Sequence, residues 1–399
     1  MSVLKYPILI TALLTSLLMT ALVGCSSMPI PKNSAQFEKP MTRLELVRLL
    51  AGRKKNNPII FTKQNLSGLE LRRFNFQGDI FTRAYLAKTD FQNANFRLAR
   101  FDQADLTGVL FMGADLRGVD FRGANLTGVD FTEANLNGAD FSGANLQGAI
   151  FSRSLLQGIK LAGAVLFDAQ FVNVYLGATD LSNLDLREVN FQGSDLSNTI
   201  LRASNLSGVD LSGVVLRSAD LASANLIRAN LDGAVLSEAL LQGAAFDAAS
   251  MEECDLRDAN LFHTRMPEVN LKKALLQGAN MSEANLSGAD LRGANMFHVT
   301  AVNSSLVWAD LRGAVLTKGD FTGTDFSDAK LDDTNLLNGI MVNTRLVATS
   351  LRAANLRGVN FQGADVRGAN FRDAELQGAE NLSKTKGLKQ ALHLEDVVL

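Results

Sequence analysis

The sequence predicts an all-β solenoid, in which the chain winds around one axis. Three observations predict it. Every fifth residue from Leu66 to Leu376 is apolar, a small residue usually stands two positions before it, and an Asp or Asn usually lies between the two. An α-helix repeats every 3.6 residues and a strand alternates every two, so a period of five held over this length indicates a repeat fold.

The five-residue unit has an inward and an outward side. Residues two apart on an extended chain point to the same side, so Ala104 and Leu106 point inward while Asp105 points outward. The next two residues, here Thr107-Gly108, suit a tight corner. Each unit is therefore a very short strand and a turn. The central residue is neither Leu nor Phe, but still apolar, at Met251, Met266, Met281, Met296, Ala301, Met341 and Val366.

Residues 114–118 (Ala-Asp-Leu-Arg-Gly) and 124–128 (Ala-Asn-Leu-Thr-Gly) resemble the A(D/N)LXX unit of the pentapeptide-repeat family. The resemblance covers residues 61–380. It implies a right-handed quadrilateral β-helix with four pentapeptides per coil and about sixteen coils. With coils spaced like neighbouring strands, ~4.8 Å apart, the rod would be roughly 77 Å long.

The Phe residues agree with a four-sided coil. From Phe91 to Phe151 every tenth residue is Phe, and the intervening fifth residues are mostly Leu. On four faces this pattern places Phe ladders on two opposite faces and Leu ladders on the other two. Large and smaller interior residues can alternate in this way to fill a narrow tube.

The open N-terminal end of a solenoid needs a cap, because it is an unpaired strand edge. An N-terminal helical cap is expected in residues 41–60, with a short amphipathic helix over 42–51. Thr42 and Glu45 have capping-box spacing, and Gly52 would stop the helix. Its apolar stripe consists of Leu46, Leu49 and Leu50.

The C-terminal end needs a cap for the same reason. Residues 381–399 are expected to supply a C-terminal cap or tail, with a second helix candidate. The apolar residues of this candidate are Leu388, Leu392 and Leu394.

The first 24 residues are predicted to be a signal peptide. Lys5 is the only charge before Cys25, and a short apolar core ends in small residues. The end of this segment resembles the lipobox of bacterial lipoproteins, which implies cleavage before Cys25 and lipidation of that residue. The lipobox residues before the cysteine are Leu22, Val23 and Gly24.

Residues 25–40 would then be a lipidated N-terminus and flexible tether, because Pro and Ser are frequent in it. The residue after the cysteine is Ser26 and not Asp. In lipoproteins this implies the outer membrane, facing the periplasm, if the host has two membranes. The alternative is an N-terminal transmembrane anchor with an unmodified cysteine.

Composition excludes several classes of partner and site. The formal net charge is −2, so there is no basic excess for nucleic acid or for a membrane surface. The densest basic cluster, 53–55 (Arg-Lys-Lys), is predicted to solvate the end of the cap helix. Cys254 takes the small inward position of its pentapeptide and is expected to be an inert buried thiol.

No catalytic or metal site is expected, and no cofactor. His263 and His298 would lie on different faces and His393 in the tail, so they cannot share a metal. The many Asp and Asn side chains are expected to bond to backbone at the corners, which leaves no catalytic dyad. A filled tube has no cleft, and an unbroken five-residue register has no long loop for a grafted active site.

One corner in the C-terminal half carries a mostly basic ladder at steps of twenty, interrupted by Asp332. It consists of Lys272, Arg292, Arg312, Arg352 and Arg372. One interpretation is a solvated face neutralised by neighbours such as Asp333 and Asp373. The other is docking of an acidic partner, a phosphorylated headgroup or a polyanionic envelope polymer.

Several outward positions in the same half are apolar. Phe262, Val302 and Val342 recur at steps of forty. One explanation is duplication of a two-coil unit, with β-branched residues tolerated on exposed strands. The other is an apolar contact patch for a partner or a membrane. Its further members are Phe297, Val307, Trp308, Leu337 and Val347.

These features predict a non-enzymatic, membrane-anchored envelope lipoprotein that works as a rigid scaffold or interaction rod. Its partner would be an envelope macromolecule, and rods could also pair as a homo-oligomer. The alternative comes from the resemblance, since some family members mimic DNA and bind type II topoisomerases. That role needs a cytosolic, strongly acidic protein, and both the leader and the near-neutral charge argue against it.

Overall fold

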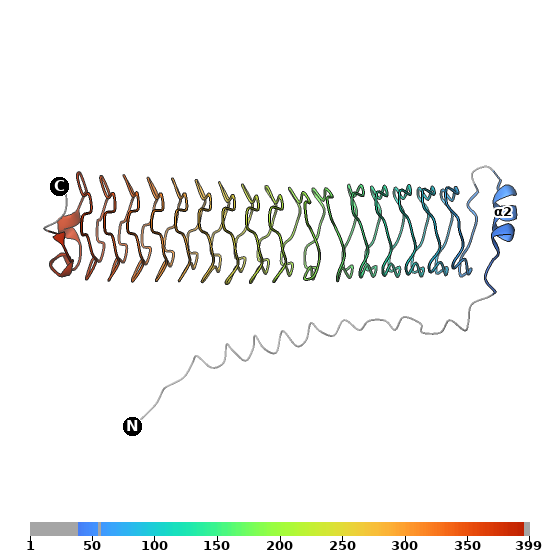
Figure 1. Cartoon of the computed structure of the whole chain (residues 1–399), viewed down its shortest axis with the longest axis horizontal. Coiled ribbons are helices and arrows are strands. Elements are labelled where there is room, and N and C mark those ends of the chain that lie inside the picture. Colours follow the sequence, from blue (N-terminus) through green and yellow to red (C-terminus); the bar gives the residue numbers. More distant parts are fainter. Residues whose placement is uncertain (1–38, 55–56, 395–399) are drawn as a thin grey trace, which may run out of the picture. The chain divides into compact units, whose positions relative to one another are not determined.

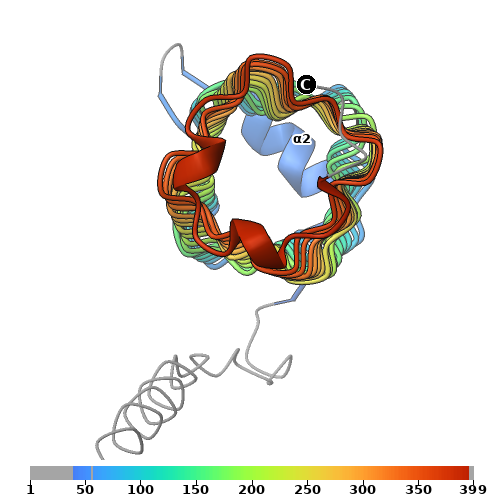
Figure 2. The same cartoon turned by 90° about the vertical axis from the view of Figure 1, so that its left-hand side faces the viewer.

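A computed structural model describes residues 39–54 and 57–394 of the chain. From residue 60 onward the backbone repeats one pattern of turn and bridge every five residues. Parallel bridges join each outward residue to the one twenty positions later, as in Ile60–Ile80, with four bridges per coil. The predicted repeat solenoid with four pentapeptides per coil is confirmed, and its strands are so short that each is a single bridge (Figures 1 and 2).

The four faces can be named by their first central residues. Face A starts at Phe61, face B at Leu66, face C at Leu71 and face D at Phe76, and each recurs every twenty residues. A corner is named by the two faces that it joins.

The corners are β-turns with one residue in the left-handed region. The amide of Ala84, for example, donates to the carbonyl of Phe81 at 2.9 Å. The residue two after the central one has a positive φ at every corner from Lys63 to Gly378. Glycine adopts this conformation without strain. Many corners nevertheless hold other residues, including Trp308 with φ 61°, so at these corners the turn imposes a left-handed conformation that is unfavourable for the residue itself.

Hydrogen bonds parallel to the axis tie the coils together. The amide of Phe81 donates to the carbonyl of Arg100 at 2.6 Å, and the amide of Arg100 donates back to Asp79 at 3.0 Å. This exchange repeats along each face, so each coil is held by its two neighbours.

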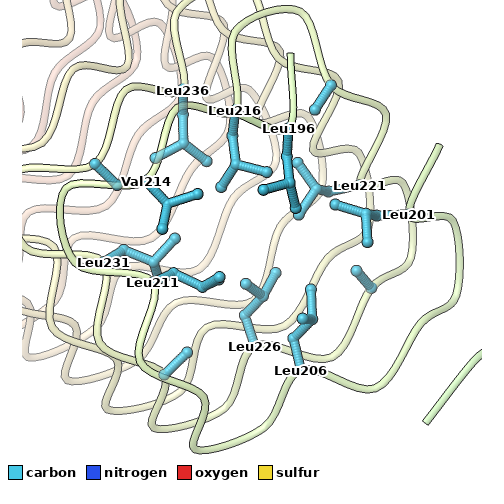
Figure 3. Close-up of a cluster of buried hydrophobic side chains, with 14 of the residues drawn as sticks. Leu196, Leu201, Leu206, Leu211, Val214, Leu216, Leu221, Leu226, Leu231 and Leu236 are labelled. Carbon is cyan, nitrogen blue, oxygen red and sulfur yellow. The ribbon is translucent and has the colours of Figure 1, made fainter. Parts of the chain in front are cut away.

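Apolar side chains fill the tube, as predicted. Rings twenty residues apart stack, with centroids 5.0 Å apart for Phe121 and Phe141. Rings ten residues apart meet edge to face from opposite faces, 6.2 Å apart for Phe111 and Phe121. The expected Phe ladders on two opposite faces are confirmed. Farther along, leucines from all sides point into the same space (Figure 3).

Helix α2 (Arg43–Ala51) covers the N-terminal end of the coils. Thr42 and Glu45 form the predicted capping box and Gly52 is the C-cap. Leu46 is fully buried, whereas Leu49 is 46% exposed. The predicted three-leucine stripe is therefore wrong at Leu49. A nine-residue helix that lies on the flat end of the coils buries only a narrow row of side chains, and Leu49 lies outside this row. Seen down the axis, α2 lies within the outline of the coils (Figure 2).

A buried ion pair fixes the chain after α2. The carboxylate of Asp79 replaces the usual small inward residue and is fully buried. It accepts hydrogen bonds from the guanidinium of Arg53 and from the amide of Ile59, the latter at 2.8 Å. Arg53 was predicted to solvate the helix end. That prediction is wrong, because the side chain turns inward to this carboxylate.

The C-terminal segment continues the solenoid. Two short 3-10 helices, η2 (Leu382–Lys384) and η3 (Leu388–Gln390), lengthen its sides, and bridges join Lys386 to Asp365 and Leu392 to Asn370. The expected α-helix over this segment is therefore wrong for the residues described, up to 394. Continuing the ladder satisfies the backbone of the last full coil, which a helix would leave unpaired. The leucines at 382, 388 and 394 pack against the core.

The ladder is interrupted at two adjacent junctions. The first, which we call the seam, lies between the coils 156–175 and 176–195. The bridges expected between Lys160 and Asp180 on face A, and between Val165 and Asp185 on face B, are not formed there. Faces C and D keep their bridges, Gln170–Asn190 and Tyr175–Asp195. The coils are less evenly spaced in this green part of the rod (Figure 1).

Candidate interaction surfaces

Outward Asp and Asn side chains cap the corners, as the sequence predicts. The carboxylate of Asp115 accepts the amide of Arg117 at 3.3 Å and its Nε at 2.8 Å. The hydrogen bond from Arg117 lowers the pKa of Asp115. The same arrangement recurs at Asp120–Arg122, Asp185–Arg187, Asp255–Arg257, Asp290–Arg292, Asp310–Arg312 and Asp365–Arg367. These carboxylates stay ionised and engaged, which does not suit general acid–base catalysis.

The histidines and the described cysteine lie apart from one another. His263 stands at corner A/B, 3.6 Å from Glu283, and His298 stands at corner D/A. Cys254 is buried, and burial raises the pKa of its thiol well above the ordinary value. Within residues 39–54 and 57–394, no three His, Cys, Asp or Glu side chains converge to hold a metal ion.

The residues predicted for lipidation, Leu22, Val23, Gly24 and Cys25, lie outside the described residues. No helix in the described part of the chain has the length and hydropathy to cross a bilayer.

The basic ladder lies along corner C/D, and nearby carboxylates neutralise most of it. A hydrogen bond from Arg292 lowers the pKa of Asp290. Among the described residues only Arg352 of this ladder has no ion pair. The other pairs are Lys272–Glu252 at 3.2 Å, Arg292–Asp290 at 2.5 Å, Arg312–Asp310 at 2.6 Å and Arg372–Asp373 at 3.5 Å. The solvated, neutralised face is therefore the better description of this surface.

The eight apolar residues predicted as a patch separate into two groups. Six of them flank face B. Phe262, Val302 and Val342 follow corner A/B, with Ser282 and Thr322 between them in the column. The other three follow corner B/C: Val307, Trp308 and Val347.

The last two, Phe297 and Leu337, lie at corner D/A, beyond the whole width of face A. The structure thus brings six of the eight to one face and excludes two. Trp308 is 67% exposed despite its left-handed backbone, an unusual placement for a bulky residue.

The structure shows four further exposed apolar residues beside the seam, in two pairs on opposite faces of the rod. Each is more than half exposed: Leu155, Val165, Phe167 and Tyr175. The first and last stack on face D as bridge partners, beside an open cavity of about 440 Å³. The other two lie on face B and at its far corner. Sequence reasoning missed both pairs, although Leu155, Val165 and Tyr175 each replace the usual outward Asp or Asn.

Comparison with known proteins identifies the repeat. A model described as pentapeptide repeats matches in eight copies, at 114–153, 164–202, 179–217, 219–258, 239–276, 254–293, 304–341 and 349–386. A model described as a pentapeptide repeat region matches 59–131. No curated protein matches the chain.

Several solved structures are similar. HetL of the cyanobacterium Nostoc sp. strain PCC 7120, a pentapeptide-repeat protein involved in heterocyst differentiation regulation, is 30% identical. The match covers 58% of this chain and 92% of HetL, with a TM-score of 0.31. Rfr23 of Cyanothece 51142 is 24% identical over 32% of this chain and 87% of its own, with a TM-score of 0.26. QnrB1, a plasmid-mediated fluoroquinolone resistance protein, is 18% identical over 53% of this chain and 92% of its own, with a TM-score of 0.24.

Proposed function

This chain belongs to the pentapeptide-repeat family, and we propose that it is a non-enzymatic, membrane-anchored lipoprotein that acts as a rigid scaffold or interaction rod in the bacterial envelope. The observation that carries the proposal is the filled interior. Central side chains are buried along the whole rod, and rings from opposite faces touch across the axis. Recognition therefore falls to the outer surface.

The anchor rests on the leader sequence. A short apolar segment followed by Leu-Val-Gly-Cys at 22–25 suits cleavage and lipidation at Cys25, and Ser26 suits the outer membrane. Acyl chains would hold a rod whose surface is otherwise polar. The test is metabolic labelling with a fatty acid in the wild type and in Cys25→Ala. We expect label only in the wild type, and equal label in both would refute the anchor.

The contact surface rests on face B of the C-terminal half. Apolar side chains line both of its edges, and the outward residues between them are Ser305, Asp325 and Arg345. In a typical protein interface polar residues surround an apolar centre. Here the arrangement is inverted, because apolar edges flank a polar strip. We therefore expect contacts along the two edges, with an extended partner segment lying over the strip.

Capture of the partner tests this surface. Phe262, Val302 and Val342 would be replaced together by Glu, and the lipidated protein would be pulled down after crosslinking in intact cells. We expect the same thermal unfolding as the wild type but much weaker capture of envelope partners. The matched control, Gln92→Glu with Thr132→Glu and Ser152→Glu at the opposite corner C/D, should capture normally. Unchanged capture by the triple variant would discard face B.

The topoisomerase-binding alternative receives no support from the described surface. A DNA mimic presents rows of unpaired carboxylates, whereas here many outward Asp residues are hydrogen-bonded to an Arg two positions later. The net charge of −2 points the same way.

A further inference from the structure

Two unusually large inward side chains coincide with the seam. From Asp79 to Ala379 the small inward position holds Ala, Gly, Ser, Thr, Val, Cys or Asp, with two exceptions, Ile159 and Leu184. Ile159 precedes the central residue of face A, and Leu184 precedes that of face B. These are the two faces on which the bridges are missing. Side chains larger than the site allows force neighbouring backbone apart.

The loss of hydrogen bonds includes these two faces and begins just before them, at the amide of Leu156 on face D. The amides of Leu161 and Leu166 make no hydrogen bond to the next coil, whereas those of Leu221 and Leu226 donate at 2.7 Å. The buried hydroxyl of Thr179, directly above Ile159, also has no partner. Its equivalent one coil later, Thr199, donates to the carbonyl of Leu176 at 3.2 Å.

Packing is looser around the seam than elsewhere. Core side chains are mostly at most 1% exposed, but five near the seam reach 4–8%: Ile159, Ala164, Val174, Leu184 and Val189. The core is therefore not closed here, although face C still carries its bridge and the bond from Phe171 to Asn190 at 2.8 Å.

The next junction opens on the opposite side. Between the coils 176–195 and 196–215 the bridge between Asn190 and Asp210 on face C is not formed, while faces A, B and D keep theirs. A cavity of about 550 Å³ lies at this place, lined in part by Val189 and Val209. The first junction is thus open on faces A and B, and the second is open on face C alone.

We propose that the coil 176–195 is a flexible joint that divides the rod into two stiff segments. The first junction lets the rod bend about faces C and D, opening at corner A/B, and the second lets it open on face C. In a solenoid each coil is held only by its neighbours, so a local loss of ladder bonds is not compensated by other contacts. This joint stands independently of the proposed function, since it rests on the backbone ladder alone.

Spin-label distances measure the joint directly. In the full chain with Cys25→Ala, labels at Gln103→Cys and Ser223→Cys lie at corner A/B on either side of the joint. The matched pair, Ser223→Cys and Asn343→Cys, spans the same number of residues at the same corner without crossing it. We expect a clearly broader distance distribution across the joint than in the matched pair. Equally narrow distributions would overturn the proposal.

Restoring the small residues tests the cause. Ile159→Ala with Leu184→Ala should close the first junction, so the amides of Leu161 and Leu166 should gain strong protection from hydrogen exchange, at least tenfold. The melting temperature should stay the same or rise. Truncation of a core side chain normally lowers the melting temperature. The control is Val119→Ala in a regular coil, which should lower it. A lower melting temperature with fast-exchanging seam amides would show that these side chains support the ladder and do not strain it.

Discussion

The coils at 91–151 and those at 301–351 have the same backbone and fill it in different ways. In the first region Phe ladders stand on two opposite faces, with Phe96 alone on a third, and the small inward residues are Ala or Val. In the second, the central residues are mostly Leu and the inward positions hold several Thr and Ser. Their hydroxyls donate to carbonyls, as Thr349 does to Phe326 at 2.8 Å. The five-residue frame therefore accepts different cores.

The largest effect should come from emptying the aromatic core. Phe121→Ala removes a ring that stacks on Phe101 and Phe141 and meets Phe111 across the axis. We expect about 3–5 kcal/mol of destabilisation, localised to a few coils because each coil contacts only its neighbours. Denaturant unfolding and hydrogen exchange would measure both. Leu311→Ala, the comparable change in the second region, should cost about 2–5 kcal/mol, and a much smaller effect at Phe121 would contradict a ring-dependent core.

The buried carboxylate near the N-terminal end should come next. Asp79→Ala restores the usual small residue but leaves the guanidinium of Arg53 and the amide of Ile59 without an acceptor. We expect about 1–3 kcal/mol of destabilisation, confined to α2 and the first coils. Hydrogen exchange of residues 43–51 should detect it. Unchanged protection there would show that the ion pair does not hold the cap.

Asp79 also gives a pH dependence. Burial raises the pKa of its carboxyl, against the opposing effect of Arg53. The folded state therefore binds this proton more tightly than the unfolded state does. The resulting contribution to the free energy of unfolding is fully present below pH 3.8, the pKa of the unfolded carboxyl, and is lost as pH rises through the folded pKa. Relative to Asp79→Asn, the wild type should gain stability on acidification in that window. Parallel curves for the two proteins would contradict it.

A smaller effect is expected from the inward hydroxyls of the second region. Thr349→Val keeps the shape and removes one hydrogen bond to the preceding coil. The expected cost is about 1 kcal/mol, read from denaturant unfolding. Thr89→Val, which removes the equivalent bond to Leu66 in the N-terminal half, should cost the same. A clear difference between the two would mean that the hydroxyls matter only where the core lacks rings.

The smallest effect should be on the surface. Asp290→Asn removes the carboxylate that pairs with Arg292 but keeps an oxygen for the corner amide. Because the pair is exposed, the loss should stay within about 0.5 kcal/mol and shrink with added salt. Melting curves at two salt concentrations would check it. A large loss would indicate that the corner depends on charge and not on the hydrogen bond.

Local and periodic features were predictable from the sequence. The spacing of Leu66 to Leu376 determines the pentapeptide, the tenfold spacing of Phe91 to Phe151 places the rings, and Thr42 with Glu45 begins the helix. Each of these depends on residues close in sequence or at a fixed step.

Features that depend on one residue meeting another across coils were not predicted. Arg53 finds Asp79 only because both end in the same inward site. Ile159 and Leu184 look like ordinary apolar residues until they are placed in their columns of twenty. The spacing of the leucines in the tail suggested a helix. In the structure the tail instead continues the ladder with sides of six residues, since its bridges lie at Glu380, Lys386 and Leu392.

The twenty-residue circuit has an evolutionary consequence. Loss or gain of one pentapeptide would preserve every inward and outward assignment, yet it would rotate all later residues by a quarter turn relative to the earlier ones. A column such as Phe262, Val302 and Val342 could thus be re-aimed around the axis by a fifteen-nucleotide deletion far upstream, with no change in its own sequence.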